Sequence, residues 1–142
     1  MTTEPRPDDL VRPCDIRGLL HAHTRNVDGC HSMQRMVETA VALDLEYLGI
    51  SDHFCSREHP EGLDVEGEAI QREEIAHLRR LFPGFEILNG VELTAEPDGA
   101  LPVQEDLLAS FDYVLVSLPE PDGAAAYTRA ALRVLENPWV SV

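Results

Sequence analysis

Five residues of types that bind metal ions fall in three separate segments of the sequence: His21, His23, Asp28, His53 and Glu92. His21 and His23 are two residues apart, and side chains at this spacing on an extended segment point the same way. Both imidazoles could therefore reach one ion. Two imidazoles and one carboxylate leave positions open for water or substrate, which is typical of hydrolytic metal sites. An ion held there lowers the pKa of its water toward ~7, so the residues predict metal-dependent hydrolysis.

Each of these signals also has a simpler interpretation. A histidine pair near a strand end is often part of a polar loop, and Asp52-His53 could form a helix cap or a turn. Glu92 could be a surface carboxylate. The combination favours the metal site, because separate loops would have to converge on one rim.

The elements that would position these residues alternate between strands and helices. Strands are predicted over 16–22, 47–51, 85–93 and 112–118, with a fifth beginning at 139–142. Helices are predicted from Ser32 as N-cap, and over 66–81, 103–110 and 124–135. This alternation indicates an α/β fold with a parallel sheet and crossover helices.

In such folds the functional groups gather at the carboxyl ends of the strands. His21 and His23 follow the first predicted strand, His53 follows the second, and Glu92 lies near the end of the third. Asp28 falls in the loop after the first strand. The predicted topology therefore brings the candidate ligands to one edge of the sheet.

Composition limits the alternatives. The chain has 142 residues and a formal net charge of −15 at pH 7, which disfavours binding of long nucleic acid or an anionic membrane. Its three cysteines contain no C-x-x-C pair, so a disulfide framework or a four-thiolate zinc site has little support. We find no signal-peptide pattern and no apolar run long enough for a membrane helix, so a cytoplasmic protein is expected.

Three motifs are similar to those of one known family. The segment IRGLLHAHT at 16–24, with Asp28-Gly29, resembles the opening motif of the PHP (polymerase and histidinol phosphatase) superfamily. YLGISDH at 47–53 looks like its second motif, and LNGVEL at 88–93 like its third. The resemblance covers about residues 15–118 and is greatest to the PHP domains of bacterial family X DNA polymerases and their stand-alone relatives.

The resemblance implies a distorted seven-stranded βα barrel that holds two or three divalent ions, often zinc, manganese or iron, and hydrolyses phosphoesters. By resemblance, His21 and His23 would hold a first metal, Glu92 would bridge it to a second, and Asp28 and His53 would hold a third. One ion at the first position is the expectation for this chain.

The sequence departs from the family pattern at two positions. Leu19 stands where the family usually has Asp, and Pro119 stands where a fourth motif normally has a metal-binding His. We therefore expect a partial, about five-stranded version of the barrel over 15–142, C-terminally truncated, after a flexible lead-in at 1–14. A degenerate domain with a structural or regulatory role and a fragment of a longer PHP protein stay open as alternatives. An unclosed sheet edge would favour a homo-oligomer or a partner chain.

Arginines near the motifs are candidates for substrate binding. Arg25, directly after the histidine pair, could grip a phosphate as a bidentate donor, and we take it as the candidate catalytic residue. A solvated loop arginine is the other interpretation, and both apply equally to Arg57. The expected substrate is a small phosphorylated molecule.

Overall fold

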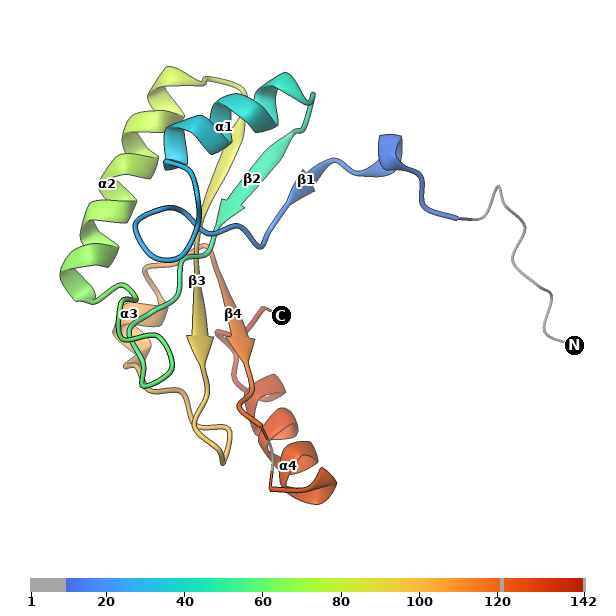
Figure 1. The fold of residues 1–142 in the computed structure, drawn as a ribbon, viewed down its shortest axis with the longest axis vertical. Helices are drawn as coiled ribbons and strands as arrows, with labels where there is room; N and C mark the ends of the chain where they lie inside the picture. Colours follow the sequence, from blue (N-terminus) through green and yellow to red (C-terminus); the bar gives the residue numbers. More distant parts are fainter. Residues whose placement is uncertain (1–9, 121, 142) are drawn as a thin grey trace, which may run out of the picture.

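The computed structural model of the chain describes residues 10–120 and 122–141. Its strands and helices alternate along the chain (Figure 1). The strands are β1 (Gly18–Leu19), β2 (Tyr47–Ile50), β3 (Glu86–Thr94) and β4 (Tyr113–Ser117). The helices are α1 (Met33–Ala42), α2 (Val65–Leu81), α3 (Glu105–Leu108) and α4 (Ala124–Leu135), preceded by a 3-10 helix at Pro13–Asp15.

All paired strands run parallel, in the spatial order β1-β2-β3-β4. This arrangement confirms the predicted parallel βα fold, and Figure 1 shows it as an open, curled sheet. The described residues form four strands rather than about five. Residues 139–141 are not a strand, although the Ser141 backbone N–H donates to the Val114 carbonyl of β4 at 2.9 Å. Val142 lies outside the described residues.

Helices α1 and α2 cover one face of the sheet (Figure 1). Between them and the strands lies a core of fully buried apolar side chains: Met33, Val37, Ala40, Leu48, Ile50, Ile75, Leu78 and Ile87. Both helices begin at polar caps. The Ser32 hydroxyl accepts a hydrogen bond from the Arg35 N–H, as the sequence predicts, and the Asp64 carboxylate accepts one from the Gly67 N–H.

A second apolar cluster lies beside the carboxyl half of β3. Val91 and Leu93 of β3 pack there against Leu108 of α3 and Val114 of β4. Odd-numbered residues of β3 therefore point toward the helices, since side chains alternate along a strand. Glu92 consequently points to the opposite face of the sheet, where the candidate ligands lie.

The predicted first strand is much shorter than its apolar stretch. Regular pairing stops at Leu19, because the backbone beyond it bonds to side chains of the neighbouring segment. The Ala22 N–H donates to the Ser51 hydroxyl at 3.2 Å, and the Thr24 N–H donates to the Asp52 carboxylate at 2.5 Å. The residues after β1 thus form an irregular loop that is nevertheless firmly attached.

The predicted lead-in at 1–14 falls mostly outside the description, since residues 1–9 are not among the described residues. Leu10 and Val11 are exposed. Within the described ranges, none of the helices has both the length and the apolar character needed to cross a membrane.

Candidate metal centre

The candidate ligands come from three consecutive strands and the loops that follow them. His21 and His23 follow β1, His53 follows β2, and Glu92 lies near the carboxyl end of β3. His53 and Glu92 form an isolated parallel bridge, and the Phe54 N–H donates to the Glu92 carbonyl at 2.9 Å. The end of β2 is thereby fixed against β3, which places both side chains at the same edge.

One group consists of His21, His23 and Glu92. The Nε2 atoms of His21 and His23 are 3.0 Å apart. One carboxylate oxygen of Glu92 lies 2.8 Å from His21 Nε2 and 3.1 Å from His23 Nε2. Three potential ligand atoms therefore surround one point, with Glu92 buried and the His21 side chain 56% exposed.

A second group shares His23 with the first. His23 Nδ1 lies 2.8 Å from an oxygen of Asp28, whose other oxygen is 3.8 Å from His53 Nε2. His53 Nδ1 is 3.5 Å from Glu92 Oε2, so it connects the two groups. All five sequence-predicted residues are therefore brought together.

This donor set fits a divalent cation. Ligand atoms about 2.0–2.2 Å from a tetrahedral ion lie about 3.4 Å from one another, close to the 2.8–3.1 Å in the first group. His53 Nδ1 is buried and has no hydrogen-bond partner among residues 10–120 and 122–141. Buried polar atoms without a partner are rare, and an ion would satisfy this one.

The charge states of the cluster suit the same role. Burial lowers the pKa of His53 below its ordinary value, and this outweighs the opposing attraction of Glu92. A neutral imidazole is the form that binds a metal. Burial alone would raise the pKa of Asp28, but the hydrogen bond from His23 and the nearby imidazoles hold it below its ordinary value. Asp28 is thus kept as a carboxylate.

The loop that carries the histidine pair is anchored to a buried carboxylate that sequence reasoning left undecided. Asp52 is fully buried and accepts hydrogen bonds from the backbone N–H and the hydroxyl of Thr24, at 2.5 and 2.6 Å. Burial raises the pKa of Asp52, and the two Thr24 bonds oppose that rise. Asp52 therefore holds the residue next to His23 instead of capping a helix.

Gly29 closes the same loop. Its N–H donates to the Thr24 carbonyl at 2.8 Å. A Cβ at this position would collide with the backbone of His23. The close approach of two backbone segments requires glycine here, and it brings Asp28 back to His23.

The structure places the candidate arginine Arg25 on the same loop. Its backbone N–H donates to the His31 carbonyl at 2.8 Å, while its side chain is exposed. It takes part in no ion pair within the part of the chain that the structure describes. The guanidinium is therefore exposed on the loop that also carries His23 and Asp28, and its catalytic role stays a prediction.

Sequence reasoning assigned no role to His59, which the structure brings to the cluster. The rings of His59 and His53 are stacked, 3.5 Å apart with 9° between their planes. The relevant signal was weak: His59 falls in the loop that follows the predicted second strand.

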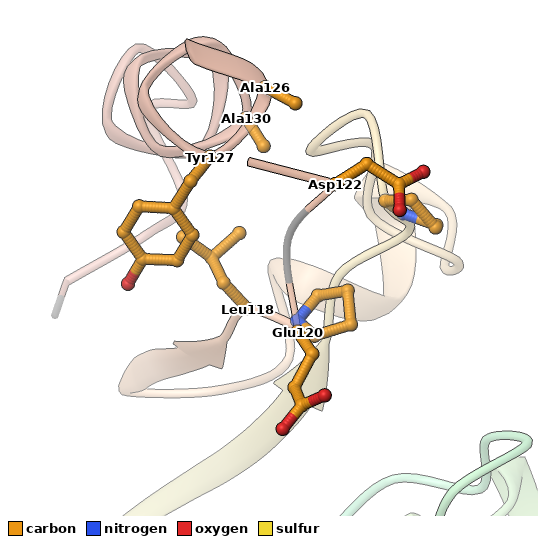
Figure 2. Close-up of a pocket in the computed structure, with 8 residues that line it drawn as sticks. Leu118, Glu120, Asp122, Ala126, Tyr127 and Ala130 are labelled. Carbon is orange, nitrogen blue, oxygen red and sulfur yellow. The ribbon is translucent and has the colours of Figure 1, made fainter. Parts of the chain in front are cut away.

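The structure also places the two positions at which the sequence departs from the family pattern, Leu19 and Pro119. Leu19 is half exposed on β1. Pro119 follows β4 and borders a cavity of about 300 Å³ between this segment and α4 (Figure 2). Its lining residues are Pro97, Leu118, Pro119, Glu120, Asp122, Ala126, Tyr127 and Ala130. None of the five candidate ligands lines this cavity.

A smaller cavity of about 190 Å³ is lined by residues that lie close in the sequence to His53 and Glu92. It is lined by residues that follow His53 and Glu92 and by the proline after β4: Ser56, Arg57, Glu58, Thr94, Ala95, Glu96, Pro97, Pro102 and Pro119. Arg57 thus borders a recess at the carboxyl ends of β2, β3 and β4.

Comparison with known proteins gives two relatives. The chain is 36% identical over 110 residues to the DNA polymerase/3'-5' exonuclease PolX of Bacillus subtilis, covering 78% of this chain and 19% of that protein. It is 28% identical over 133 residues to a probable phosphatase of Acetivibrio thermocellus, covering 88% of this chain and 53% of that protein. No family model matches the chain. The chain therefore spans about half of the length of the probable phosphatase and about a fifth of the length of PolX.

Proposed function

We propose that this chain is a metal-binding phosphoesterase domain of the PHP superfamily. The observation that carries the proposal is the convergence of the segments after β1 and β2 with strand β3. They bring together His21, His23, Asp28, His53 and Glu92 in two groups that share His23, and the potential ligand atoms within each group lie within 4.8 Å of one another. Similarity to PolX and to a probable phosphatase supports it, because both names refer to chemistry on phosphate esters.

The proposed assignment of ligands to ions follows from the two ring nitrogens of His23. Its Nε2 faces the group with His21 and Glu92, while its Nδ1 faces Asp28. If Nε2 of His23 held an ion, its Nδ1–H would donate to Asp28, and a carboxylate in this position would orient the ring and make it a better ligand. We therefore assign the first ion to His21, His23 and Glu92. Asp28 supports it, and with His53 it offers ligands for a further ion.

A divalent ion bound there would polarise a phosphoryl oxygen and make a water molecule acidic enough to attack at neutral pH. The residues of the chain would supply the rest. Arg25 would bind the phosphate with two parallel hydrogen bonds. Buried Glu92 and His53 keep the ligand atoms in a partly water-excluded setting, where electrostatic interactions are stronger.

The proposed substrate is a small phosphate ester. The formal net charge of −15 repels a long polyanion. The cavity of about 190 Å³ at the carboxyl ends of β2, β3 and β4, with Arg57 on its border, has room for a small group attached to the phosphate. Zinc, manganese and iron all suit imidazole and carboxylate ligands.

The test measures metal content and turnover on the same protein. The chain is purified without chelator, its metals are quantified, and hydrolysis of p-nitrophenyl phosphate and bis-p-nitrophenyl phosphate is followed with added Mn²⁺ or Zn²⁺. We expect a bound ion and turnover, both lost in the double variant His21→Ala/His23→Ala. His77→Ala, an exposed histidine on α2, is the matched control and should behave as the wild type. Equal turnover in the double variant would overturn the proposal.

One observation favours a second candidate, a domain that binds metal without hydrolysing esters. Pro119 directly follows the segment that contains β4 and lines the same cavity as Arg57. Proline has no side chain that can bind a metal. A stoichiometric ion without turnover on either ester would support this candidate. A stoichiometric ion together with turnover would remove it.

A further inference from the structure

The segment that carries His21 and His23 is not held by strand pairing. β1 ends at Leu19, two residues before the first histidine. What fixes His21 must therefore be found among contacts on either side of it. These contacts come from β4 and from the end of β2.

Tyr113 reaches this segment from β4, which lies at the opposite edge of the sheet from β1. It begins β4, where it pairs with Gly90 of β3, and it is buried. Its hydroxyl donates a hydrogen bond of 2.5 Å to the Leu20 carbonyl, the peptide unit directly before His21. One side chain therefore connects the last strand to the loop that follows the first.

Two glycines make room for this crossing. A Cβ at Gly90 of β3 would collide with the Tyr113 ring, and a Cβ at Gly49 of β2 would collide with its hydroxyl. Gly90 and Glu92 are two residues apart on one strand, so they share a face of the sheet. The tyrosine thus lies across the same face that presents Glu92.

The peptide unit on the other side of His21 is held as well. The Ala22 N–H donates to the Ser51 hydroxyl at 3.2 Å, and the Ala22 carbonyl accepts from the Ser51 N–H at 2.9 Å. Burial raises the pKa of Tyr113, so its hydroxyl stays a proton donor at neutral pH. His21, with an exposed side chain, consequently stands on a backbone fixed at both ends.

We propose that Tyr113 is a positioning residue for the metal site, which holds His21 in reach of Glu92 through its bond to the Leu20 carbonyl. This inference rests on the proposed function for its metal, but not for the contact itself. Tyr113 would not touch the ion, because its hydroxyl bonds to a backbone carbonyl. Partners that hydrogen-bond a metal ligand directly are worth about 10–100-fold in metal affinity, so a contact to the peptide unit before His21 should be worth about 10-fold, the lower end of that range.

The test compares Tyr113→Phe with the matched control Tyr127→Phe, which removes the hydroxyl of an exposed tyrosine on α4. Affinity for Zn²⁺ is measured by calorimetry, and the ligand geometry by the visible absorption spectrum of the Co²⁺ form. We expect Tyr113→Phe to bind Zn²⁺ about 10-fold more weakly, with an altered Co²⁺ spectrum. Its unfolding midpoint should fall by less than about 8 °C. Wild-type affinity and an unchanged spectrum in Tyr113→Phe would overturn the inference.

A metal-free measurement separates this inference from the proposed function. Amide hydrogen exchange of Ala22 in the chelator-treated protein should be faster in Tyr113→Phe than in the wild type or in Tyr127→Phe. Unchanged exchange would overturn the positioning role even if no ion binds. A wild type that binds no ion, with faster exchange in the variant, would overturn the proposed function and keep the contact. If Tyr113→Phe does not fold, Gly49→Ala displaces the same hydroxyl and is expected to weaken Zn²⁺ binding; unchanged binding would count against the role.

Discussion

The imidazole rings of His53 and His59 lie face to face, with centroids 3.5 Å apart and planes inclined by 9°. The loop that brings them together is closed by two short-range bonds. The His59 N–H donates to the Ser56 hydroxyl at 3.0 Å, and the Ser56 N–H donates to the His59 carbonyl at 3.1 Å. His59 therefore covers one face of a buried candidate ligand.

Replacing His59 by Ala should remove this cover and destabilise the chain. Aromatic pairs contribute about 0.5–1.5 kcal/mol beyond their area, so thermal unfolding should begin about 2–8 °C lower. His59→Phe keeps a flat ring and is the matched control, with an expected midpoint near that of the wild type. Equal loss in both variants would show that the stack itself contributes nothing.

Metal binding should raise the unfolding temperature. An ion that binds only the folded chain at 100 times its Kd stabilises it by about 2.7 kcal/mol. We expect Zn²⁺ or Mn²⁺ to shift the midpoint upward, EDTA to reverse the shift, and His21→Ala/His23→Ala to abolish it. A shift of the same size in that double variant would place the ion elsewhere.

Arg25→Ala should lower kcat/KM for p-nitrophenyl phosphate without changing metal content. Hydrogen bonds to charged groups contribute about 1.5–3 kcal/mol, which corresponds to roughly a 10–150-fold loss. Arg80→Ala, an exposed arginine on α2, is the control. If Arg57→Ala lowers kcat/KM and Arg25→Ala does not, the phosphate is bound from the side of the smaller cavity.

The ion pair between Asp98, in the turn after β3, and Arg133 of α4 should be sensitive to acid. The hydrogen bond from the Ala100 N–H, with that of Arg133, holds the pKa of Asp98 below its ordinary value of 3.8. A lowered folded-state pKa contributes stability that is present above 3.8 and is lost as the pH falls through the folded-state value. The midpoint difference between wild type and Asp98→Asn should therefore shrink on acidification. Asp106→Asn, which removes a charge from α3, is the control, and a difference that stays constant down to about pH 2 would contradict the assignment.

Gly90→Ala should destabilise the chain, because its methyl group would overlap the Tyr113 ring. Overpacking of this kind costs about 1–3 kcal/mol, which denaturant unfolding can measure. The same change at Gly67, near the start of α2, meets only side-chain atoms, of Leu63 at 3.2 Å and of Asp64 at 3.4 Å, and should be neutral or stabilising. Equal stability of Gly90→Ala and wild type would mean that the ring can move aside.

Much of the fold could be predicted from local patterns. Ser32 is a polar cap followed by helically spaced apolar residues, and α1 begins at the next residue. The strand predicted over 16–22 is longer than the observed β1, Gly18–Leu19. The apolar pattern does not reveal that the Ala22 and Thr24 N–H groups bond to the side chains of Ser51 and Asp52. The fifth predicted strand does not form within residues 139–141.

The candidate site was predictable where residue type and topology agree. His21, His53 and Glu92 end neighbouring parallel strands, and this alone places them at one edge. His59 and Tyr113 could not be found in this way. Their contacts depend on the closure of one loop and on a side chain that crosses two strands, and neither leaves a spacing signal in the sequence.

The order of the strands in the sheet is also their order in the chain, and this bears on how the molecule assembles. During synthesis, each new strand can be added to the edge that the previous one has just formed, without inserting between strands already paired. His21 nevertheless meets Glu92 only after 71 further residues have been made. The nascent chain therefore carries an incomplete ligand set until β3 has joined the sheet, and we expect cation binding to follow the pairing of β3 with β2.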